Sequence, residues 1–211
     1  MDTVRAVNTV SAMSLPETET ETSPARADRV TIRNQRPDER ARVRDIITRS
    51  FGRAVVADLA EALQDAPAGV DGLSFVAELD GQLLGHAQLS RSWLDAPERL
   101  VEVLVLSPVS LVPEFQRHGL GGRLVNHALR EAAEVGAPMV FLEGSPHYYR
   151  RFGFETASRR GFTAPSVRIP DAAFQVVVLP SYETWMTGAL VYAEQFWALD
   201  CVGLREPNPD L

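Results

Sequence analysis

The first apolar run of the chain, over residues 30–33, predicts a short strand. Pro37 and Asp38 then favour the start of a helix, because proline fits the first helical turn. A second helix is predicted over residues 53–64. The apolar positions that give the first helix its spacing are Val43, Ile46, Ile47 and Phe51.

Two apolar runs on either side of Asp80-Gly81 predict a β-hairpin. They cover residues 73–79 and 83–89. The Asp-Gly pair between them supplies the positive φ angles that a tight turn needs.

The third strand of the predicted sheet is split by a proline. It covers residues 101–106 and resumes at residues 109–112. Pro108 lies between the two parts and cannot donate a hydrogen bond to a neighbouring strand. We therefore expect a bulge or an unpaired edge there.

Helical spacing returns in the middle of the chain and strand-like runs follow it. Residues 139–142 predict a buried strand, residues 146 onward a short aromatic helix, and residues 174–179 a later strand. The apolar residues of the helix, which ends near Gly136, are Leu120, Leu124, Ala128, Leu129 and Ala132. This order predicts a mixed α/β (α+β) domain around a largely antiparallel sheet, with helices covering the sheet.

The N-terminal residues 1–28 differ in composition from everything that follows. They are rich in Thr, Glu, Ser and Pro, so they cannot bury enough apolar surface to offset the entropy of the chain. We expect a disordered tail there and a single domain over residues 29–211.

Charge and composition exclude several classes of protein. The net charge is −7 and no basic stripe stands out, so we expect no nucleic-acid partner. No segment approaches the roughly 18 consecutive apolar residues of a membrane helix, and the first residues lack the apolar run of a secretory signal. Cys201 is the only cysteine, which fits a reducing compartment. We predict a cytoplasmic protein with no membrane partner.

The most informative stretch is the glycine-rich turn after the third strand. The turn opens into a helix, whose first backbone N–H groups are unpaired and whose dipole favours negative charge. Glycines also let the backbone approach a bulky diphosphate. The alternative is that they only turn the chain tightly. The residues of the turn are Gln116, Arg117, His118, Gly119, Leu120, Gly121 and Gly122.

At two motifs the chain resembles the GNAT-type N-acetyltransferase superfamily. The hallmark Gln/Arg-x-x-Gly-x-Gly/Ala is matched by Gln116, Gly119 and Gly121. Downstream, residues 144–154 resemble the family's Tyr-x-x-x-Gly-Phe element, in a form similar to the YhbS-like branch. The resemblance covers about residues 30–196. It implies a GNAT-like central sheet with a splay between two strands, and acetyl-coenzyme A as acetyl donor.

The resemblance also implies roles for the turn and for the strand before it. The backbone N–H groups from Arg117 to Gly122 would hold the pyrophosphate of coenzyme A. Val109 and Leu111 would pair with the pantetheine arm, and Val109 would face the acetyl carbonyl, where a donor stabilises the developing oxyanion. The alternative is that both residues are simply strand core.

Tyr149 matches the tyrosine of the second motif and is the predicted acid. A phenol is protonated at neutral pH and can donate to the departing thiolate; the alternative is a half-buried tyrosine with a structural partner. The base is harder to assign, because the family's strand glutamate corresponds to Val105 here. Glu102 and Glu143 are the nearby carboxylates, Glu143 being the candidate we favour, and solvent could serve instead.

Together these features predict an N-acetyltransferase in which a primary amine attacks the thioester directly. The alternatives are a non-catalytic acyl-coenzyme A sensor and a nucleotide-binding structural protein. The four histidines show no metal-ligand spacing, so no metal is expected. The acceptor is a small-molecule or peptide amine of unknown identity, and homodimer formation is left open. Aromatic residues that could line the acceptor pocket, a subunit interface or the core are Trp185, Tyr192, Phe196 and Trp197.

Overall fold

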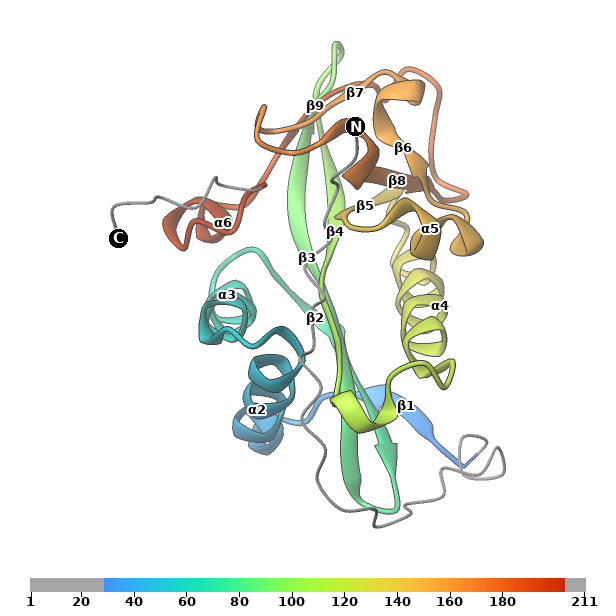
Figure 1. Cartoon of the computed structure of the whole chain (residues 1–211). Coiled ribbons are helices and arrows are strands. Elements are labelled where there is room, and N and C mark those ends of the chain that lie inside the picture. The colour runs from blue at the N-terminus through green and yellow to red at the C-terminus, as the bar shows by residue number, and fades with distance from the viewer. Residues whose placement is uncertain (1–28, 204–211) are drawn as a thin grey trace, which may run out of the picture.

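The computed structural model describes residues 29–203, and the predicted tail over residues 1–28 lies outside the described residues. Most of the fold is a mixed sheet in the order β1-β2-β3-β4-β5-β8-β6, with β9 beside β3 and β7 (Figure 1). The strands are β1 (Thr31–Asn34), β2 (Gly69–Leu79), β3 (Gln82–Asp95), β4 (Leu100–Leu111), β5 (Met139–Glu143), β6 (Glu155–Thr156), β7 (Phe162–Thr163), β8 (Phe174–Val178) and β9 (Gly188–Val191).

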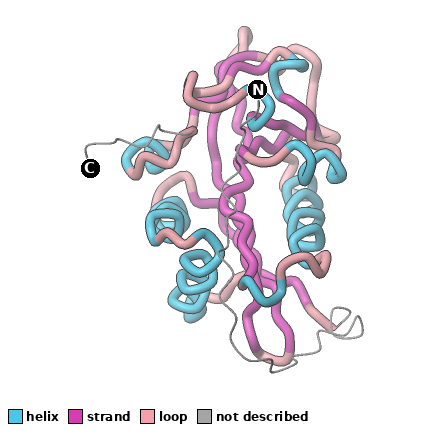
Figure 2. The backbone as a smooth tube through the Cα atoms, viewed as in Figure 1, coloured by secondary structure: helices cyan, strands magenta, loops and turns pink. Residues whose placement is uncertain are grey.

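Helices cover both faces of the sheet. The α-helices are α2 (Arg40–Phe51), α3 (Ala54–Asp65), α4 (Leu120–Glu134), α5 (Pro146–Tyr149) and α6 (Glu194–Ala198). Helices α2 and α3 lie on one side of the long strands and α4 lies on the other (Figures 1 and 2). Antiparallel pairs dominate the sheet, and β4–β5 and β7–β9 are parallel. The predicted fold class is confirmed.

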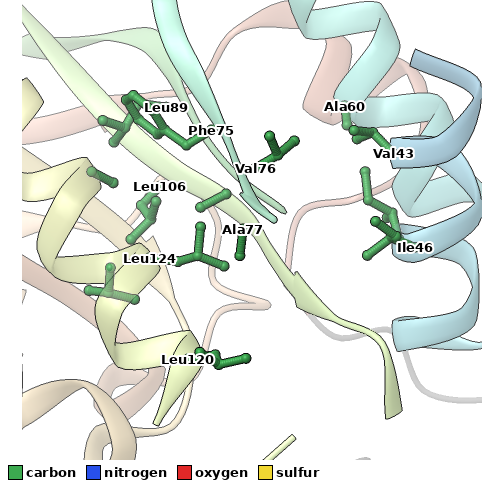
Figure 3. Close-up of a cluster of buried hydrophobic side chains, with 14 of the residues drawn as sticks. Val43, Ile46, Ala60, Phe75, Val76, Ala77, Leu89, Leu106, Leu120 and Leu124 are labelled. Atoms are coloured by element: carbon green, nitrogen blue, oxygen red, sulfur yellow. The ribbon is translucent and has the colours of Figure 1, made fainter. Parts of the chain in front are cut away.

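The alternation of side chains along the strands explains how both faces become apolar. Val76 points toward Val43 and Ile46 of α2, whereas its neighbour Phe75 lies on the side of α4, where Leu124 packs (Figure 3). Successive strand residues point to opposite faces, so strands covered on both sides read as continuous apolar runs. Phe75 has no exposed surface, and such burial contributes about 1.5–3 kcal/mol for a large side chain.

Buried side chains form two hydrophobic clusters that meet along β4. The first cluster contains Leu104 and Leu106 of β4 and packs against α4 and α2. The second takes Val103 and Val105, which point to the opposite face, and includes Phe196 of α6. The C-terminal third of the chain therefore completes the core on the α3 face of the sheet.

The predicted splay is the point where β4 and β5 part. The two strands pair in parallel only at Leu104↔Val140 and Val105↔Phe141. Strand β4 then continues to Leu111, whereas β5 ends at Glu143. Opposite Pro108, the register between β3 and β4 shifts between Ala87 and Leu89, which confirms the expected bulge.

No helix in residues 29–203 combines the length and the apolar character that crossing a bilayer requires.

Candidate active site

The glycine turn leads from the end of β4 into α4. A short 3-10 turn spans Pro113–Phe115, and Gln116 then donates from Nε2 to the Leu111 carbonyl at 3.2 Å. Arg117 and Gly119 both have left-handed backbones, with φ of 66° and 80°. The first helical hydrogen bond runs from the Arg123 N–H to the Gly119 carbonyl at 3.2 Å. The N–H groups of residues 120–122 precede it and lie at the positive end of the helix dipole.

The glycines of this turn serve different purposes. Gly119 needs its positive φ, and an added Cβ there would meet no other atom within 4 Å. Gly121 needs its lack of a side chain, because an added Cβ would lie 2.5 Å from the Tyr148 hydroxyl and 3.4 Å from Leu111 Cδ1. Gly122 is similarly close to the Phe152 ring. The turn, β4 and α5 therefore meet at Gly121. Close packing requires a glycine at this position, in addition to the predicted role of the turn in binding the diphosphate.

Two arginines approach the turn in different ways. Arg123 donates from Nη2 to the Val30 carbonyl at 2.5 Å, which ties the start of α4 to the N-terminal edge of the sheet. Arg151 places its guanidinium 4.1 Å from the centroid of the Tyr148 ring and 5.0 Å from that of Phe152. Sequence analysis did not single out Arg151, although its place two residues before Gly153 in the aromatic motif could have drawn attention to it.

Backbone donors of β4 face the gap between the parted strands. The Val112 N–H donates to the Leu84 carbonyl of β3 at 2.9 Å. N–H groups alternate in direction along a strand, so those of Val109 and Leu111 point away from β3. Leu111 confirms this geometry, because its N–H reaches Ser50 Oγ in α2 at 3.4 Å. This contact is at the long end of the hydrogen-bond range.

Tyr149 sits on α5 in an aromatic setting. Its ring lies 4.9 Å from that of Tyr148 and 5.7 Å from that of Phe154, centroid to centroid. It packs so closely on Gly144 that an added Cβ there would lie 2.5 Å from the ring. Burial, with a smaller contribution from Tyr148, raises the pKa of Tyr149 above its ordinary value. The phenol therefore stays protonated throughout the neutral range.

Glu143 ends β5, two residues beyond the last β4–β5 pair, and its side chain points to the α3 face. The Tyr192 hydroxyl donates to Oε1 at 2.9 Å and the Gly203 N–H donates to Oε2 at 3.1 Å. Glu143 is exposed to solvent, although protein groups bind both of its carboxylate oxygens. Burial raises the pKa of Glu143, while Tyr192, Gly203 and Arg168 oppose that rise. A carboxylate with a raised pKa is a better proton acceptor.

The other carboxylate considered as a base lies elsewhere. Glu102 is exposed near the start of β4, where its Oε2 lies 2.8 Å from Arg91 Nε. Val105, which corresponds to the family's glutamate, is buried in the second cluster with 1% of its surface exposed. Of the two carboxylates, Glu143 is the one at the gap.

The aromatic residues and the cysteine that the sequence singled out differ in how deeply they are buried. Tyr192 and Phe196 are buried in the second cluster, whereas Trp197 is exposed. Cys201 has a pKa raised foremost by burial, which disfavours the reactive thiolate. Within residues 29–203, no group of three or more His, Cys, Asp or Glu side chains is arranged to hold a metal ion.

The gap between two parallel strands, with a helix N-terminus at one end, is the arrangement that the resemblance to the GNAT class implied. The family model described as acetyltransferase (GNAT) domain matches residues 31–157. The chain belongs to this family. The resemblance drawn from the two motifs is thereby confirmed.

Two relatives from Escherichia coli point to the YhbS-like branch of the family. YjhQ of Escherichia coli, an uncharacterized N-acetyltransferase, is 32% identical over 124 residues, 58% of this chain and 68% of YjhQ. YhbS of the same organism, also uncharacterized, is 29% identical over 169 residues, 78% of this chain and 97% of YhbS.

Two solved structures share the fold. The crystal structure of YhbS with CoA has a TM-score of 0.70 at 28% identity, covering 80% of this chain and 92% of YhbS. A GNAT acetyltransferase of Brucella melitensis in complex with acetyl-CoA has a TM-score of 0.64 at 30% identity, covering 79% of this chain and 97% of its own.

Proposed function

We propose that the chain is an N-acetyltransferase that transfers the acetyl group of acetyl-coenzyme A to a primary amine by direct attack. The observation that carries the proposal is the parting of β4 and β5 beyond Val105, with the N-terminus of α4 at one end and Glu143 beside it. The related structures of YhbS and of the Brucella protein hold CoA and acetyl-CoA in the same fold, which supports the choice of donor.

The diphosphate of the donor would bind at the glycine turn. The N–H groups of residues 117–122 supply donors, and the positive end of the α4 dipole favours the negative charge. The side chains of Gln116, Arg117 and His118 in the same turn are exposed, and Arg151 adds a cation over the Tyr148 ring, which packs on Gly121. Leu111 and Val109 would pair with the pantetheine arm through their backbone groups. Pairing at Leu111 would replace the long contact of its N–H with Ser50 Oγ.

The chemistry would use three groups of the chain. Glu143 takes the proton that the attacking amine must lose, since an aliphatic amine is protonated near neutral pH. The Val109 N–H stabilises negative charge that develops on the carbonyl oxygen. As the carbon–sulfur bond breaks, the Tyr149 hydroxyl donates a hydrogen bond to the departing sulfur. Because its pKa lies above that of a thiol, the proton stays closer to the phenol.

The main alternative is a sensor that binds acyl-coenzyme A without turning it over, and the valine at the family's glutamate position favours it. Turnover of acetyl-coenzyme A with a broad amine panel, measured beside binding by calorimetry, separates the two. Amine-dependent release of coenzyme A supports the enzyme. Binding without turnover by any amine supports the sensor. Equal affinity for ADP and coenzyme A would support a structural nucleotide-binding protein instead.

The acceptor, the location and the oligomeric state of the protein are further hypotheses. The acceptor would be a small-molecule or peptide amine. A cytoplasmic location, a single domain over residues 29–211 and homodimer formation stay hypotheses that rest on the sequence.

A further inference from the structure

Both oxygens of the Glu143 carboxylate are bound by groups from the C-terminal part of the chain. Tyr192 lies 49 residues later and reaches Oε1 through its hydroxyl at 2.9 Å. Gly203 lies 60 residues later and reaches Oε2 through its backbone N–H at 3.1 Å. A carboxylate held at both oxygens has a fixed orientation, which an isolated surface glutamate would not have.

Tyr192 is itself firmly placed. It directly follows β9, which pairs with β3 through Val191↔Trp93. Its ring stacks on Phe196 of α6 at a centroid distance of 4.6 Å and an interplanar angle of 22°. Only 5% of its surface is exposed. The sheet and α6 therefore fix the hydroxyl in front of Glu143.

Gly203 is also placed by its surroundings. Its φ is 64°, and an added Cβ would lie 2.7 Å from the carbonyl carbon and oxygen of Arg168. Arg168 in turn donates from Nη1 to Asp200 Oδ1 at 3.2 Å. The segment that ends at Gly203 is thus held against the loop of Arg168 while its N–H faces the carboxylate.

We propose that Tyr192 is a positioning residue for Glu143, and that with the Gly203 N–H it holds this carboxylate charged and oriented toward the acceptor amine. The inference rests on the proposed function, in which Glu143 is the base. It deepens that function by making the C-terminal segment part of the acceptor side of the site.

The direction of the expected pH effect follows from the charges around Glu143. Tyr192, the Gly203 N–H and Arg168 favour the charged carboxylate, whereas burial disfavours it. Cys201 lies close enough to Glu143 to be affected by its charge, and Asp200 acts on the same thiol. Removing the Tyr192 hydroxyl removes a hydrogen bond to the charged form. The pKa of Glu143 then rises, and the acid limb of kcat/KM moves to higher pH.

The test is the pH profile of acetyl transfer by Tyr192→Phe, which keeps the ring and its stacking on Phe196. We expect the acid limb to move up by about one pH unit, so that kcat/KM below the limb falls about tenfold and recovers at higher pH. Tyr182→Phe is the matched control, because Tyr182 is half-buried in the same cluster and its hydroxyl interacts with Arg160. Its profile should match that of the wild type.

Glu143→Gln makes the two possible failures distinguishable. If Glu143→Gln keeps full activity with an unchanged profile, Glu143 is not the base and the proposed mechanism fails. If Glu143→Gln is impaired but the profile of Tyr192→Phe superimposes on that of the wild type, the positioning role fails while the base survives. A pH-independent loss in Tyr192→Phe, with an unchanged melting temperature, also contradicts the positioning role. The double variant should lose no more than Glu143→Gln alone.

Discussion

The two sides of the candidate site are built in opposite ways. On the cofactor side, Val109, Leu111 and Tyr148 pack against the first cluster, and the proposed contacts with coenzyme A are mainly backbone N–H groups. On the acceptor side, Tyr192 and Cys201 belong to the second cluster or pack against it, and the proposed contact with the amine is the side chain of Glu143.

The difference determines what each side requires of the sequence. A backbone site depends on φ angles and close packing, so a short stretch of neighbouring residues can specify it. A side-chain site depends on which distant segments the sheet brings together. Substitutions in the glycine turn should therefore change affinity for the cofactor, whereas substitutions of the reacting side chains Glu143 and Tyr149 should change the chemical step.

The largest effect is expected from Glu143→Gln. A positioned base contributes about 10²–10⁴-fold, so kcat/KM should fall by that factor while acetyl-coenzyme A affinity stays the same. Glu102→Gln is the control, since Glu102 is bonded to Arg91 away from the gap, and its rate should stay near that of the wild type. A large loss of cofactor affinity in Glu143→Gln would contradict the division between the two sides.

Tyr149→Phe should give the next largest effect, about a hundredfold in kcat with cofactor affinity nearly intact, because it removes a hydrogen-bond donor to the developing negative charge. Because burial raises the pKa of Tyr149, its ionisation should cause no fall in the wild-type rate below about pH 10. Single-turnover rates are the measurement, since slow product release can hide a chemical loss. Wild-type single-turnover rates in Tyr149→Phe would remove the hydroxyl from the mechanism.

Gly121→Ala tests the packing of the turn and should weaken acetyl-coenzyme A binding about tenfold, or about 1.4 kcal/mol. The new Cβ would overlap the Tyr148 hydroxyl at 2.5 Å. Adding Tyr148→Phe removes that atom, so the double variant should regain most of the affinity. No recovery in calorimetric titrations would mean that the ligand itself, and not Tyr148, needs the glycine.

The smallest expected effect is on the free energy of unfolding, and it comes from His86, which is buried on the α3 face of the sheet. Burial lowers the pKa of His86 to about 3, and its Nε2 lies 2.9 Å from Ser74 Oγ. The unfolded chain takes up this proton below about pH 6.5 and the folded chain does not. Stability is therefore lost as pH falls through that window, by about 1.4 kcal/mol at pH 5.5. Denaturant unfolding of His86→Gln at pH 7.5 and 5.5 checks this, because the variant should lose less on acidification than the wild type.

Sequence analysis predicted the parts of the fold that local patterns encode. The hairpin at Asp80-Gly81, the bulge at Pro108 and the helix after Gly119 each follow from a few adjacent residues, and all are confirmed. Strands β7 and β9 were missed, since they have only 2 and 4 residues and are held by pairing with β3 and with each other.

The same limit applies to the candidate site. The residues of the turn and the aromatic motif lie close together in sequence, and the structure brings them together at Gly121. The contacts of Tyr192 and Gly203 with Glu143 span 49 and 60 residues. No spacing rule connects residues so far apart, so only the fold could reveal that these groups meet.

A crystal structure with acetyl-coenzyme A would test the central claim most directly. We predict the diphosphate on the N–H groups of residues 117–122, with the acetyl carbonyl beside the Val109 N–H and open to Glu143. A depression of about 680 Å³ lies between α2 and the β2–β3 turn, lined by Arg42, Asp45 and Gln82 among others. Cofactor bound there, with the gap between β4 and β5 closed by side chains, would contradict the account.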